Sequence, residues 1–491
     1  MGAYRLATEL RRQNYNVLVL DFFGRWIQDR KSFDALLKSV ISDETVFVGY
    51  SGTFFSTNTT VSSTINEYND FYRHDTISTW PCDVNYIKLL NLRIKSLNPD
   101  IKIFYGGAWA SFLTSNLSPK FTGVDYIVQG FADSYIVDLV HRLQEKKHIP
   151  YSFENDCKVI KYDVTGQKFN FSDQGQTIYH ESDCFSASEV LPLETSRGCM
   201  FKCKFCSFPL LGRKKNDNSY HKSPTVVAQE LEHNYKMFGV TGYMFVDDTF
   251  NETTDKIKEI HDAIKQSGVD IKFACYLRLD LIERYPEQIQ LLKDMGVQSV
   301  FLGVETLNPR SARAVGKNSD PESVKQTLEL MREILGDQCS IYASFIVGLP
   351  HETEETFNQW MSWVYDREDL IDSLRMNALT LNGQDASWPS EISKNPEKFG
   401  YTFDQNNNWI NNVGMTEQTA QRLSNEWLKK GFETGRIKIG GFDIMGLQNM
   451  GFSFDELKNL EMRSLPIKTL RDCYQQMFND YKQRLLAYLN K

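Results

Sequence analysis

The stretch ETSRGCMFKCKFCSF, residues 194–208, places three cysteines in one short loop directly after a predicted strand. Cys199, Cys203 and Cys206 follow the spacing Cys-x3-Cys-x2-Cys. Thiolates are the usual ligands of iron–sulfur clusters, and cysteines this close can bind a single cluster. Three ligands leave one iron of a four-iron cluster open to a further ligand. Two alternatives stay open: unrelated structural thiols, and zinc, although a structural zinc site normally has four protein ligands.

The sequence around the cysteine loop alternates between strand and helix patterns from residue 190 to residue 382. The predicted strands are Val190–Glu194, Tyr243–Val246, Ile271–Leu277, Ser299–Val304, Ile341–Val347 and Leu374–Leu381. The predicted helices between them are Pro224–Phe238, Thr254–Ser267, Pro286–Met295, Pro321–Leu335 and Glu354–Asp366. Six such units predict a partial (β/α)6 TIM-like barrel, whose site lies at the carboxyl ends of the strands.

The rest of the chain divides into three further regions. Because the first of them also alternates strands and helices, the predicted fold class is α/β. Residues 1–148 alternate helices with short strands, including Val17–Asp21, which predicts a doubly wound, Rossmann-like domain. Residues 149–189 are polar and poorly periodic, and we interpret them as a connector. Residues 383–491 predict a mainly helical domain, with Glu417–Lys430 and Leu470–Leu489 as its clearest helices.

Composition narrows the classes of partner and compartment. A chain of 491 residues is too long for one core and predicts two or three domains. The net charge of −8, without a long basic run, argues against nucleic acid as a partner. No apolar stretch is long enough to span a membrane, and no secretion signal is recognisable at residue 1. The nine cysteines therefore indicate reduced thiols or metal ligands, and we expect a cytoplasmic protein.

The cysteine motif and its place after a strand resemble the radical S-adenosylmethionine (SAM) superfamily, and the similarity extends over most of residues 190–382. The resemblance implies a [4Fe-4S] cluster on the three cysteines, with SAM bound to the open iron. It further implies reductive cleavage of SAM to a 5′-deoxyadenosyl radical that abstracts a substrate hydrogen. The electron would come from an external donor such as flavodoxin or ferredoxin. Phe205, beside the last cysteine, would lie near the adenine of SAM; a buried core aromatic is the alternative.

Other positions of the barrel fit the same resemblance. Asp247 and Asp248 end a buried strand and could accept a hydrogen bond from the ammonium group of SAM or cap the next helix. Arg278 follows the third strand, where the family often has a basic contact to the SAM carboxylate. Glu305 ends the fourth strand, whose terminal acid often contacts SAM in the family. Lys317 also stands where many relatives have a lysine, although we expect a solvated charge.

Residues 1–148 resemble the cobalamin-binding domain that precedes the barrel in one radical SAM subgroup. The matching residues are small and stand at strand ends: Ser51, Thr53, Gly106 and Gly107. The usual Asp-x-His-x-x-Gly is absent. The sequence begins at the helix matching residues 3–12, so either the chain is truncated or the strand that normally precedes this helix is missing. Cobalamin binding and a scaffold that has lost it therefore both stay open.

Three hypotheses follow. The first is a radical SAM enzyme that modifies a peptide or other small-molecule natural product without cobalamin, as the proteusin-type peptide epimerases do. Cys275 and Cys339 would be its candidate hydrogen donors, with buried inert thiols as the alternative reading. The second is a cobalamin-dependent radical SAM methyltransferase acting on carbon or phosphorus. The third is a non-enzymatic iron–sulfur or zinc protein.

Overall fold

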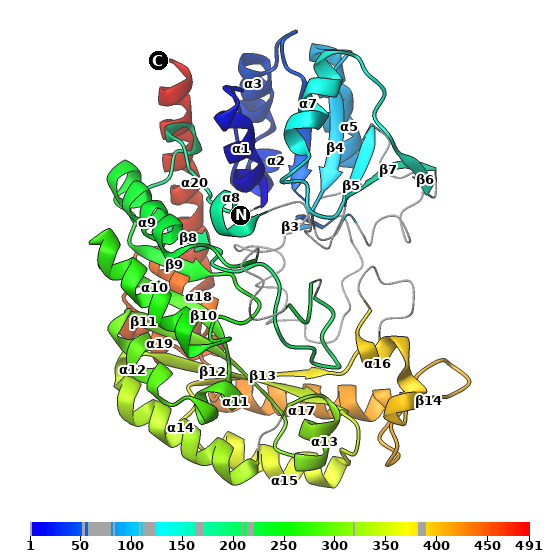
Figure 1. Ribbon diagram of the computed structural model, residues 1–491, viewed down its shortest axis with the longest axis vertical. Helices are drawn as coiled ribbons and strands as arrows, with labels where there is room; N and C mark the ends of the chain where they lie inside the picture. Colours follow the sequence, from blue (N-terminus) through cyan, green and yellow to red (C-terminus); the bar gives the residue numbers. More distant parts are fainter. Residues whose placement is uncertain are drawn as a thin grey trace. The chain divides into compact units, whose positions relative to one another are not determined.

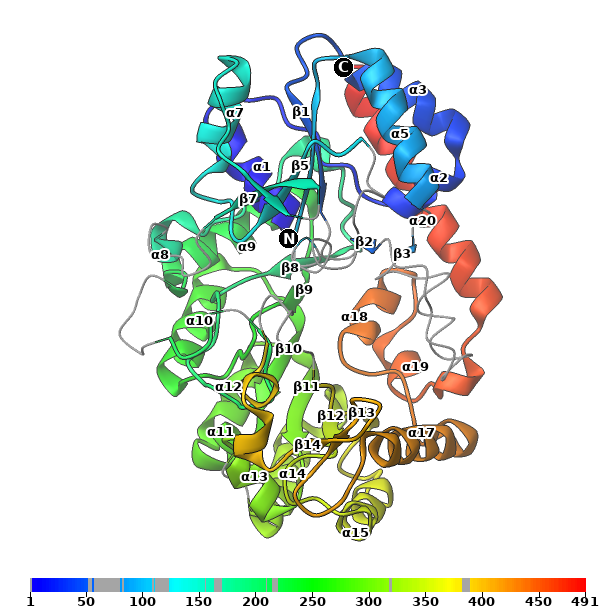
Figure 2. The same ribbon diagram turned by 90° about the vertical axis from the view of Figure 1, so that its right-hand side faces the viewer.

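The structure is a computed structural model in which two compact units are distinguished (Figures 1 and 2). It describes residues 2–51, 55–56, 80–81, 84–107, 110, 123–154, 156–162, 170–208, 210–213, 220–317, 320–381 and 389–491. Unit 1 comprises Met1–Asn170, Gln174–Phe185 and Ile467–Lys491, and unit 2 comprises Phe171–Asp173 and Ser186–Pro466. Among the described residues, no helix is long and apolar enough to cross a membrane.

Unit 1 contains a five-stranded sheet with the order β1-β4-β5-β7-β6. Four of its strands are parallel, and only β6 runs antiparallel, beside β7. The strands are β1 (Phe47–Ser51), β4 (Lys102–Gly106), β5 (Tyr126–Gln129), β6 (Ser152–Glu154) and β7 (Cys157–Lys161). The helices that precede or connect them are α1 (Gly2–Arg12), α2 (Phe23–Gln28), α3 (Arg30–Val40), α5 (Val84–Leu97) and α7 (Ile136–Gln144). This is the doubly wound pattern that the alternation predicted.

The last helix, α20 (Ile467–Leu489), belongs to unit 1. Its buried residues Phe478, Tyr481 and Leu485 join one apolar cluster with Trp26 of α2 and with residues of α3 and α5. The rings of Trp26 and Phe478 meet edge to face, with centroids 5.1 Å apart. Burial of large aromatic side chains is the strongest apolar contribution per residue, so α20 is an integral part of this core.

Unit 2 contains a sheet of six parallel strands in sequential order, β13-β12-β11-β10-β9-β8. The strands are β8 (Val190–Leu193), β9 (Gly242–Phe245), β10 (Lys272–Arg278), β11 (Val297–Glu305), β12 (Ser340–Val347) and β13 (Ser373–Ala378). The connecting helices are α9 (Pro224–Phe238), α10 (Thr254–Ser267), α11 (Leu279–Arg284), α12 (Glu287–Asp294), α13 (Pro309–Ala314), α14 (Pro321–Leu335) and α15 (Glu354–Tyr365). Most of these helices lie along one face of the sheet (Figure 1). The predicted α/β fold class with a partial barrel is confirmed.

The connecting helices begin and end where the sequence carries capping residues. Ser223 caps α9 through its side chain, and Gly239 ends the helix with the left-handed backbone that glycine adopts at little cost. Thr253 and Gly268 play the same parts for α10. These local signals explain why both predicted helices have the observed bounds.

The opposite, inner face of the sheet is covered in part by α18 (Phe442–Gln448), which contacts β9, β10 and β11 (Figure 2). Gly440 and Gly441, just before α18, lie against Tyr342 of β12. The remaining elements after the barrel are α16 (Glu391–Lys394), β14 (Thr402–Phe403), β15 (Trp409–Ile410), α17 (Glu417–Thr434) and α19 (Phe454–Lys458).

Two predictions about secondary structure were wrong. Val17–Asp21 is not a strand, because side chains occupy backbone groups at both ends: Arg11 donates to the Val17 carbonyl, and the Asp21 N–H donates to the Tyr481 hydroxyl. The predicted connector also contains ordered strands, since β6 and β7 extend the sheet of unit 1. The sequence did not indicate these two strands, because polar side chains on their exposed faces leave little alternation of apolar residues.

Candidate functional site

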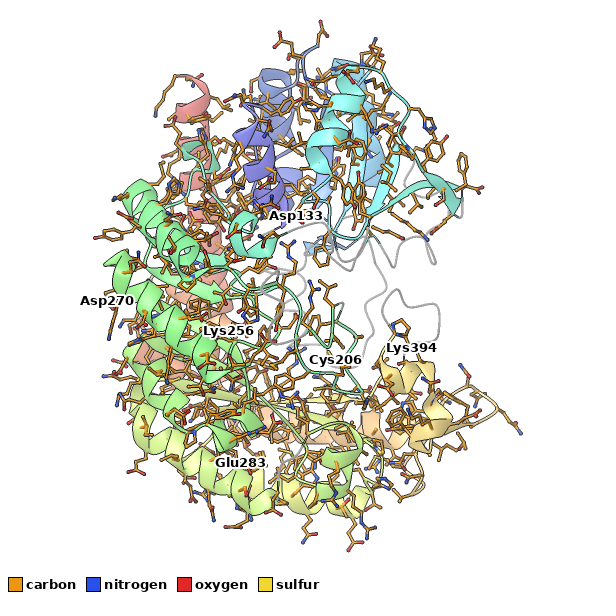
Figure 3. The ribbon with its side chains drawn as sticks, viewed as in Figure 1. Asp133, Cys206, Lys256, Asp270, Glu283 and Lys394 are labelled. Atoms are coloured by element: carbon orange, nitrogen blue, oxygen red, sulfur yellow. The ribbon has the colours of Figure 1, made fainter. Side chains whose placement is uncertain are left out.

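The three cysteines lie on one loop of unit 2 that leaves β8, and hydrogen bonds close this loop on itself. The Gly212 N–H donates to the Cys199 carbonyl at 2.7 Å, and the Cys206 N–H donates to the Cys203 carbonyl at 3.1 Å. Gly198 has a φ of 94°, where a side chain would collide with the Leu210 carbonyl, so only glycine fits this turn. Cys199 is buried, and the other two cysteines are half-buried. Figure 3 labels Cys206 on this loop.

The sulfur atoms are surrounded by groups that can donate hydrogen bonds. The Phe201 N–H donates to Cys199 Sγ at 3.4 Å, and the Thr249 hydroxyl lies 3.4 Å from the same sulfur. Arg278 Nη1 donates to Cys203 Sγ at 2.8 Å. Hydrogen bonds to sulfur are typical of iron–sulfur sites, where they stabilise thiolate charge. The donor set therefore fits a cluster held by Cys199, Cys203 and Cys206, as the spacing predicts.

Burial disfavours the deprotonated form of the free thiols, whereas the hydrogen bonds to sulfur favour it. It raises the pKa of Cys199 to about 11 and the pKa of Cys206 to about 12. A bound metal centre would supply the positive charge that keeps such buried sulfurs deprotonated. Among the described residues, no three His, Cys, Asp or Glu side chains form a ready-made site for a single metal ion.

Asp247 anchors the start of the cysteine loop to the end of β9. Its carboxylate accepts hydrogen bonds from the Thr195 N–H at 2.7 Å, the Thr195 hydroxyl and the Ser196 N–H at 3.1 Å. It also pairs at 2.9 Å with Lys256 of α10. Figure 3 labels Lys256. Burial opposes ionisation, but Lys256 and Thr195 hold the pKa of Asp247 below its usual value. These partners occupy Asp247, so its observed role is to position the loop.

Lys256 and Glu252, which the sequence analysis did not identify, complete this support together with Asn251. Lys256 also donates to the Ser196 hydroxyl at 2.8 Å, and Glu252 accepts from the Met200 N–H at 2.8 Å. Asn251 clamps the next strand end by accepting from the Arg278 N–H and donating to the Arg278 carbonyl. The sequence signal for these residues was a run of polar side chains between a buried strand and a helix. This run did not indicate which groups the side chains contact.

Asp248 differs from its neighbour because no hydrogen bond or ion pair involves it within the described part of the chain. It is half-buried. Burial, followed by the charges of Asp247, Glu194 and Glu252, raises its pKa to about 7. A carboxylate of this kind at a strand end can recognise a cationic group. Of the two acids predicted to face a cofactor ammonium, Asp248 is the one that its surroundings leave available.

Arg278 ends β10 as predicted, but its guanidinium has partners already. Its Nε and Nη2 donate to the two carboxylate oxygens of Asp280 at 3.0 and 2.6 Å. The guanidinium also lies over the Phe201 ring, 4.1 Å from its centroid. The arginine is thus held beside the cysteine loop rather than extended towards open space.

Glu305, at the end of β11, has a φ of 72°, and the register with β12 shifts at this point. A positive φ in a residue with a side chain costs free energy and is often found at functional sites. Lys317 Nζ lies 3.6 Å from Glu305 and donates to the Gly303 carbonyl at 3.0 Å. Only 3% of the Lys317 side chain is exposed, so the expectation of a solvated lysine was wrong.

Beyond Glu305, the turn after β12 contains a second buried acid that the sequence did not single out. Glu352 accepts hydrogen bonds from the Gly348 N–H at 2.8 Å and from the Thr306 hydroxyl at 3.1 Å. Gly348 has a φ of 97°, and a side chain there would collide with Trp409. This turn therefore has a structural role at the end of β12.

Cys275 points away from the inner face of the sheet, and Cys339 lies directly before β12. Side chains alternate along a strand, and the neighbouring Tyr276 stacks edge to face with Phe301, which together with Tyr342 lies on the face covered by α18. Cys275 is 0% exposed and Cys339 1% exposed. Burial raises the pKa of Cys339 to about 12. Both thiols fit the alternative interpretation of buried, inert core residues.

In unit 1, the predicted cobalamin contacts lie at the carboxyl ends of neighbouring strands. Ser51 of β1 pairs directly with Gly106 of β4, and Gly107 follows with a φ of 97°. A side chain added at Gly106 would meet Val128 only at ordinary contact distance, so packing within the sheet does not require glycine there. Small residues at this edge fit the close approach of a large ligand. Thr53 lies outside the described residues; Phe205 is half-buried, and its role stays a prediction.

The comparison with family models supports the class that this fold and loop define. Residues 193–364 match the radical SAM superfamily. The chain therefore carries a radical SAM domain, and the family resemblance drawn from the sequence is confirmed. That family implies the [4Fe-4S] cluster and SAM that the cysteine loop predicts.

Among curated proteins, the chain is similar to methyltransferases. It is 24% identical over 276 residues to an uncharacterised methyltransferase of Pyrococcus horikoshii, covering 53% of this chain and 57% of the relative. It is 28% identical over 193 residues to the hopanoid C-2 methylase of Rhodopseudomonas palustris, covering 38% of this chain and 35% of the relative. The alignments thus span about half or less of these relatives' lengths.

Among solved structures, the radical SAM methyltransferase TsrM from Kitasatospora setae has a similar fold. Its structure with cobalamin and a [4Fe-4S] cluster bound matches with a TM-score of 0.55 and 14% identity, covering 97% of this chain and 96% of that chain. At this identity the comparison shows a shared fold, and the match includes both units.

Proposed function

We propose that this protein is a cobalamin-dependent radical SAM methyltransferase. The observation that carries the proposal is the match over nearly the whole chain to a methyltransferase that holds both cobalamin and a [4Fe-4S] cluster. The curated relatives named as methyltransferases support the same reaction. The first hypothesis from the sequence, hydrogen abstraction without cobalamin, is supported less well, because no curated or structural relative reported above is an epimerase.

The residues of unit 2 have distinct parts in this proposal. Cys199, Cys203 and Cys206 hold the cluster, whose chemistry when loaded is to pass an electron to SAM. Asp247 and Lys256 keep the loop in position, and Asp248 binds the ammonium group of SAM. Glu305, held by Lys317, lines the same end of the sheet and contacts SAM.

The residues of unit 1 at the ends of β1 and β4 supply a binding edge with small, uncharged side chains. Ser51, Gly106 and Gly107 let a corrin or its nucleotide tail approach the backbone at the ends of β1 and β4. Bound cobalamin would supply the methyl-carrying chemistry. The substrate is a small molecule or peptide, and the electrons come from an external donor such as flavodoxin or ferredoxin.

The test is anaerobic reconstitution of the full chain with iron, sulfide and hydroxocobalamin, followed by desalting, a visible spectrum and product analysis with SAM and reductant. Retained corrin bands together with S-adenosylhomocysteine are expected. Cluster absorption with 5′-deoxyadenosine but no retained corrin would instead support the cobalamin-free enzyme.

The Cys199→Ala variant is the matched control, because it removes one cluster ligand and leaves unit 1 unchanged. It should lose the cluster and all SAM-derived products while retaining corrin. If the unmodified chain itself formed neither a cluster nor products, the non-enzymatic hypothesis would replace the proposal.

A further inference from the structure

We infer that Arg278 is a positioning residue that tunes the reduction potential of the cluster, rather than a ligand of the SAM carboxylate. The inference rests on the proposed cluster ligation by Cys203. Its starting point is the hydrogen bond of 2.8 Å from Arg278 Nη1 to Cys203 Sγ. Among the described residues, no other charged side chain donates a hydrogen bond to one of the three cysteine sulfurs.

The hydrogen-bond inventory of Arg278 argues against the carboxylate role. A guanidinium has five N–H donors. Two of them point at Asp280, one at Cys203 and one, at 3.5 Å, at the Gly316 carbonyl. The edge formed by Nε and Nη2, which would grip a carboxylate with two parallel hydrogen bonds, is already occupied by Asp280. One N–H is left, which is too few for paired recognition of a second carboxylate.

The surroundings hold this arginine in one position. Asn251 binds both its backbone N–H, at 2.9 Å, and its carbonyl, at 3.0 Å. The Phe201 ring, two residues from Cys199 in the cysteine loop, supports the face of the guanidinium. The Arg278 side chain is only 8% exposed, so solvent screens its charge poorly. Such a charge is placed to act on the cluster at a constant distance.

The charge of Arg278 shifts the reduction potential of the cluster in a definite direction. Reduction adds one electron to the cluster and its thiolates. A cation that donates a hydrogen bond to a ligand sulfur stabilises this more negative state, because reduction potentials of clusters depend on such hydrogen bonds and on net charge. Arg278 therefore raises the potential and makes the cluster easier for its donor to reduce. Asp280 offsets part of this effect, but it binds the far edge of the guanidinium.

The experiment compares the cluster-loaded full chain with Arg278→Gln, which keeps an N–H donor without the charge, and Arg278→Lys, which keeps the charge. Arg284→Met is the control, because it removes an exposed arginine from α11, the next helix. Iron and sulfide contents are measured first. A redox titration followed by electron paramagnetic resonance then gives the midpoint potential, and equilibrium dialysis gives the SAM affinity of the oxidised protein.

For Arg278→Gln, the ratio of reduced to oxidised cluster at a set potential should fall about tenfold, which is about 59 mV for a one-electron couple. Arg278→Lys should shift less in the same direction, and Arg284→Met should not shift. An unchanged potential in a fully loaded Gln variant overturns the inference, and a loss of SAM affinity alone would assign Arg278 to the SAM carboxylate. If the Gln variant cannot hold a cluster, the Lys variant decides by the same criteria. A wild-type chain without a cluster would instead contradict the proposed function.

Discussion

The two parallel sheets of this protein carry different kinds of residue at their carboxyl ends. In unit 2, the strand ends carry Asp247, Arg278 and Glu305, and buried partners hold each of these charged side chains. In unit 1, the corresponding strand ends carry Ser51 and Gly106. The comparison shows that strand ends of the same kind can carry oriented charge, as in unit 2, or small uncharged residues, as at β1 and β4 of unit 1. Under the proposed function, the first arrangement suits SAM and the second suits the close approach of cobalamin.

The largest effect is expected from the cysteine loop. Cys199→Ser should abolish cluster assembly and every SAM-derived product, because a hydroxyl is a poor replacement for a thiolate that binds iron. Counting iron and sulfide after anaerobic reconstitution measures the loss. Cys275→Ser is the matched control, since this buried thiol lies outside the loop, and it should retain the cluster. Equal cluster content in the two variants would contradict the assignment.

The charged network of unit 2 should be sensitive to the loss of one partner. Lys256→Met leaves the buried carboxylates of Asp247 and Glu252 without their cation, which should lower the free energy of unfolding by about 3–5 kcal/mol. Urea unfolding measures the change. Lys236→Met, which breaks an exposed pair with Glu232 on α9, should cost less than about 1 kcal/mol. A similar small cost at both lysines would show that the network does not stabilise the fold.

The raised pKa of Asp248 gives the site a pH dependence. Because this carboxyl loses its proton near pH 7, its attraction for the SAM ammonium should grow between pH 6 and pH 8. The expected gain in affinity is about tenfold for a single group of that pKa. Equilibrium dialysis of SAM with the cluster-loaded chain measures it. Asp248→Asn should bind weakly at both pH values, and a persisting pH dependence in that variant would assign it to another group.

The same raised pKa has an opposite consequence for stability. The folded state binds the Asp248 proton more tightly than the unfolded state does, so this group contributes stability below pH 4. That contribution is lost as the pH rises through about 7. Ligand recognition and stability therefore make opposite demands on this carboxyl.

The smallest change in stability is expected at the accessible edge of unit 1. Gly106→Ala adds a methyl group that meets Val128 at 3.7 Å, so the free energy of unfolding should change by less than about 0.5 kcal/mol. If corrin approaches this edge, its retention after desalting should nevertheless fall. Gly130→Ala is the contrasting variant, because its methyl group would stand 2.4 Å from the Tyr162 carbonyl oxygen and should destabilise the fold. Undiminished corrin retention in Gly106→Ala would contradict the proposed contact.

The sequence predicted those features that depend on local pattern. The bounds of α9, α10 and α14 match because capping residues mark both of their ends. The cluster ligands Cys199, Cys203 and Cys206 could be predicted because their close spacing is typical of thiolates that bind one iron–sulfur cluster. The six strands of unit 2 were found because buried parallel strands form continuous apolar runs.

Features that depend on distant contacts were not predictable. One partner of Asp247, Thr195, lies 52 residues before it, and another, Lys256, lies in the following helix. The sequence alone therefore could not distinguish Asp247, which anchors the loop, from the neighbouring carboxylate of Asp248. Lys317 looked solvated because its pairing with Glu305 follows from the shape of the turn after β11. The place of α20 in unit 1 depends on contacts with residues more than 400 positions away, which no local pattern encodes.

The place of α20 also has a consequence for the order of events during protein synthesis. Translation completes residues 186–466 before it reaches residues 467–491, whereas the core of unit 1 contains Phe478, Tyr481 and Leu485. Domains generally fold as units as they leave the ribosome. Unit 2 can therefore fold on the nascent chain, while the earlier-made unit 1 keeps part of its apolar surface uncovered until its last helix emerges.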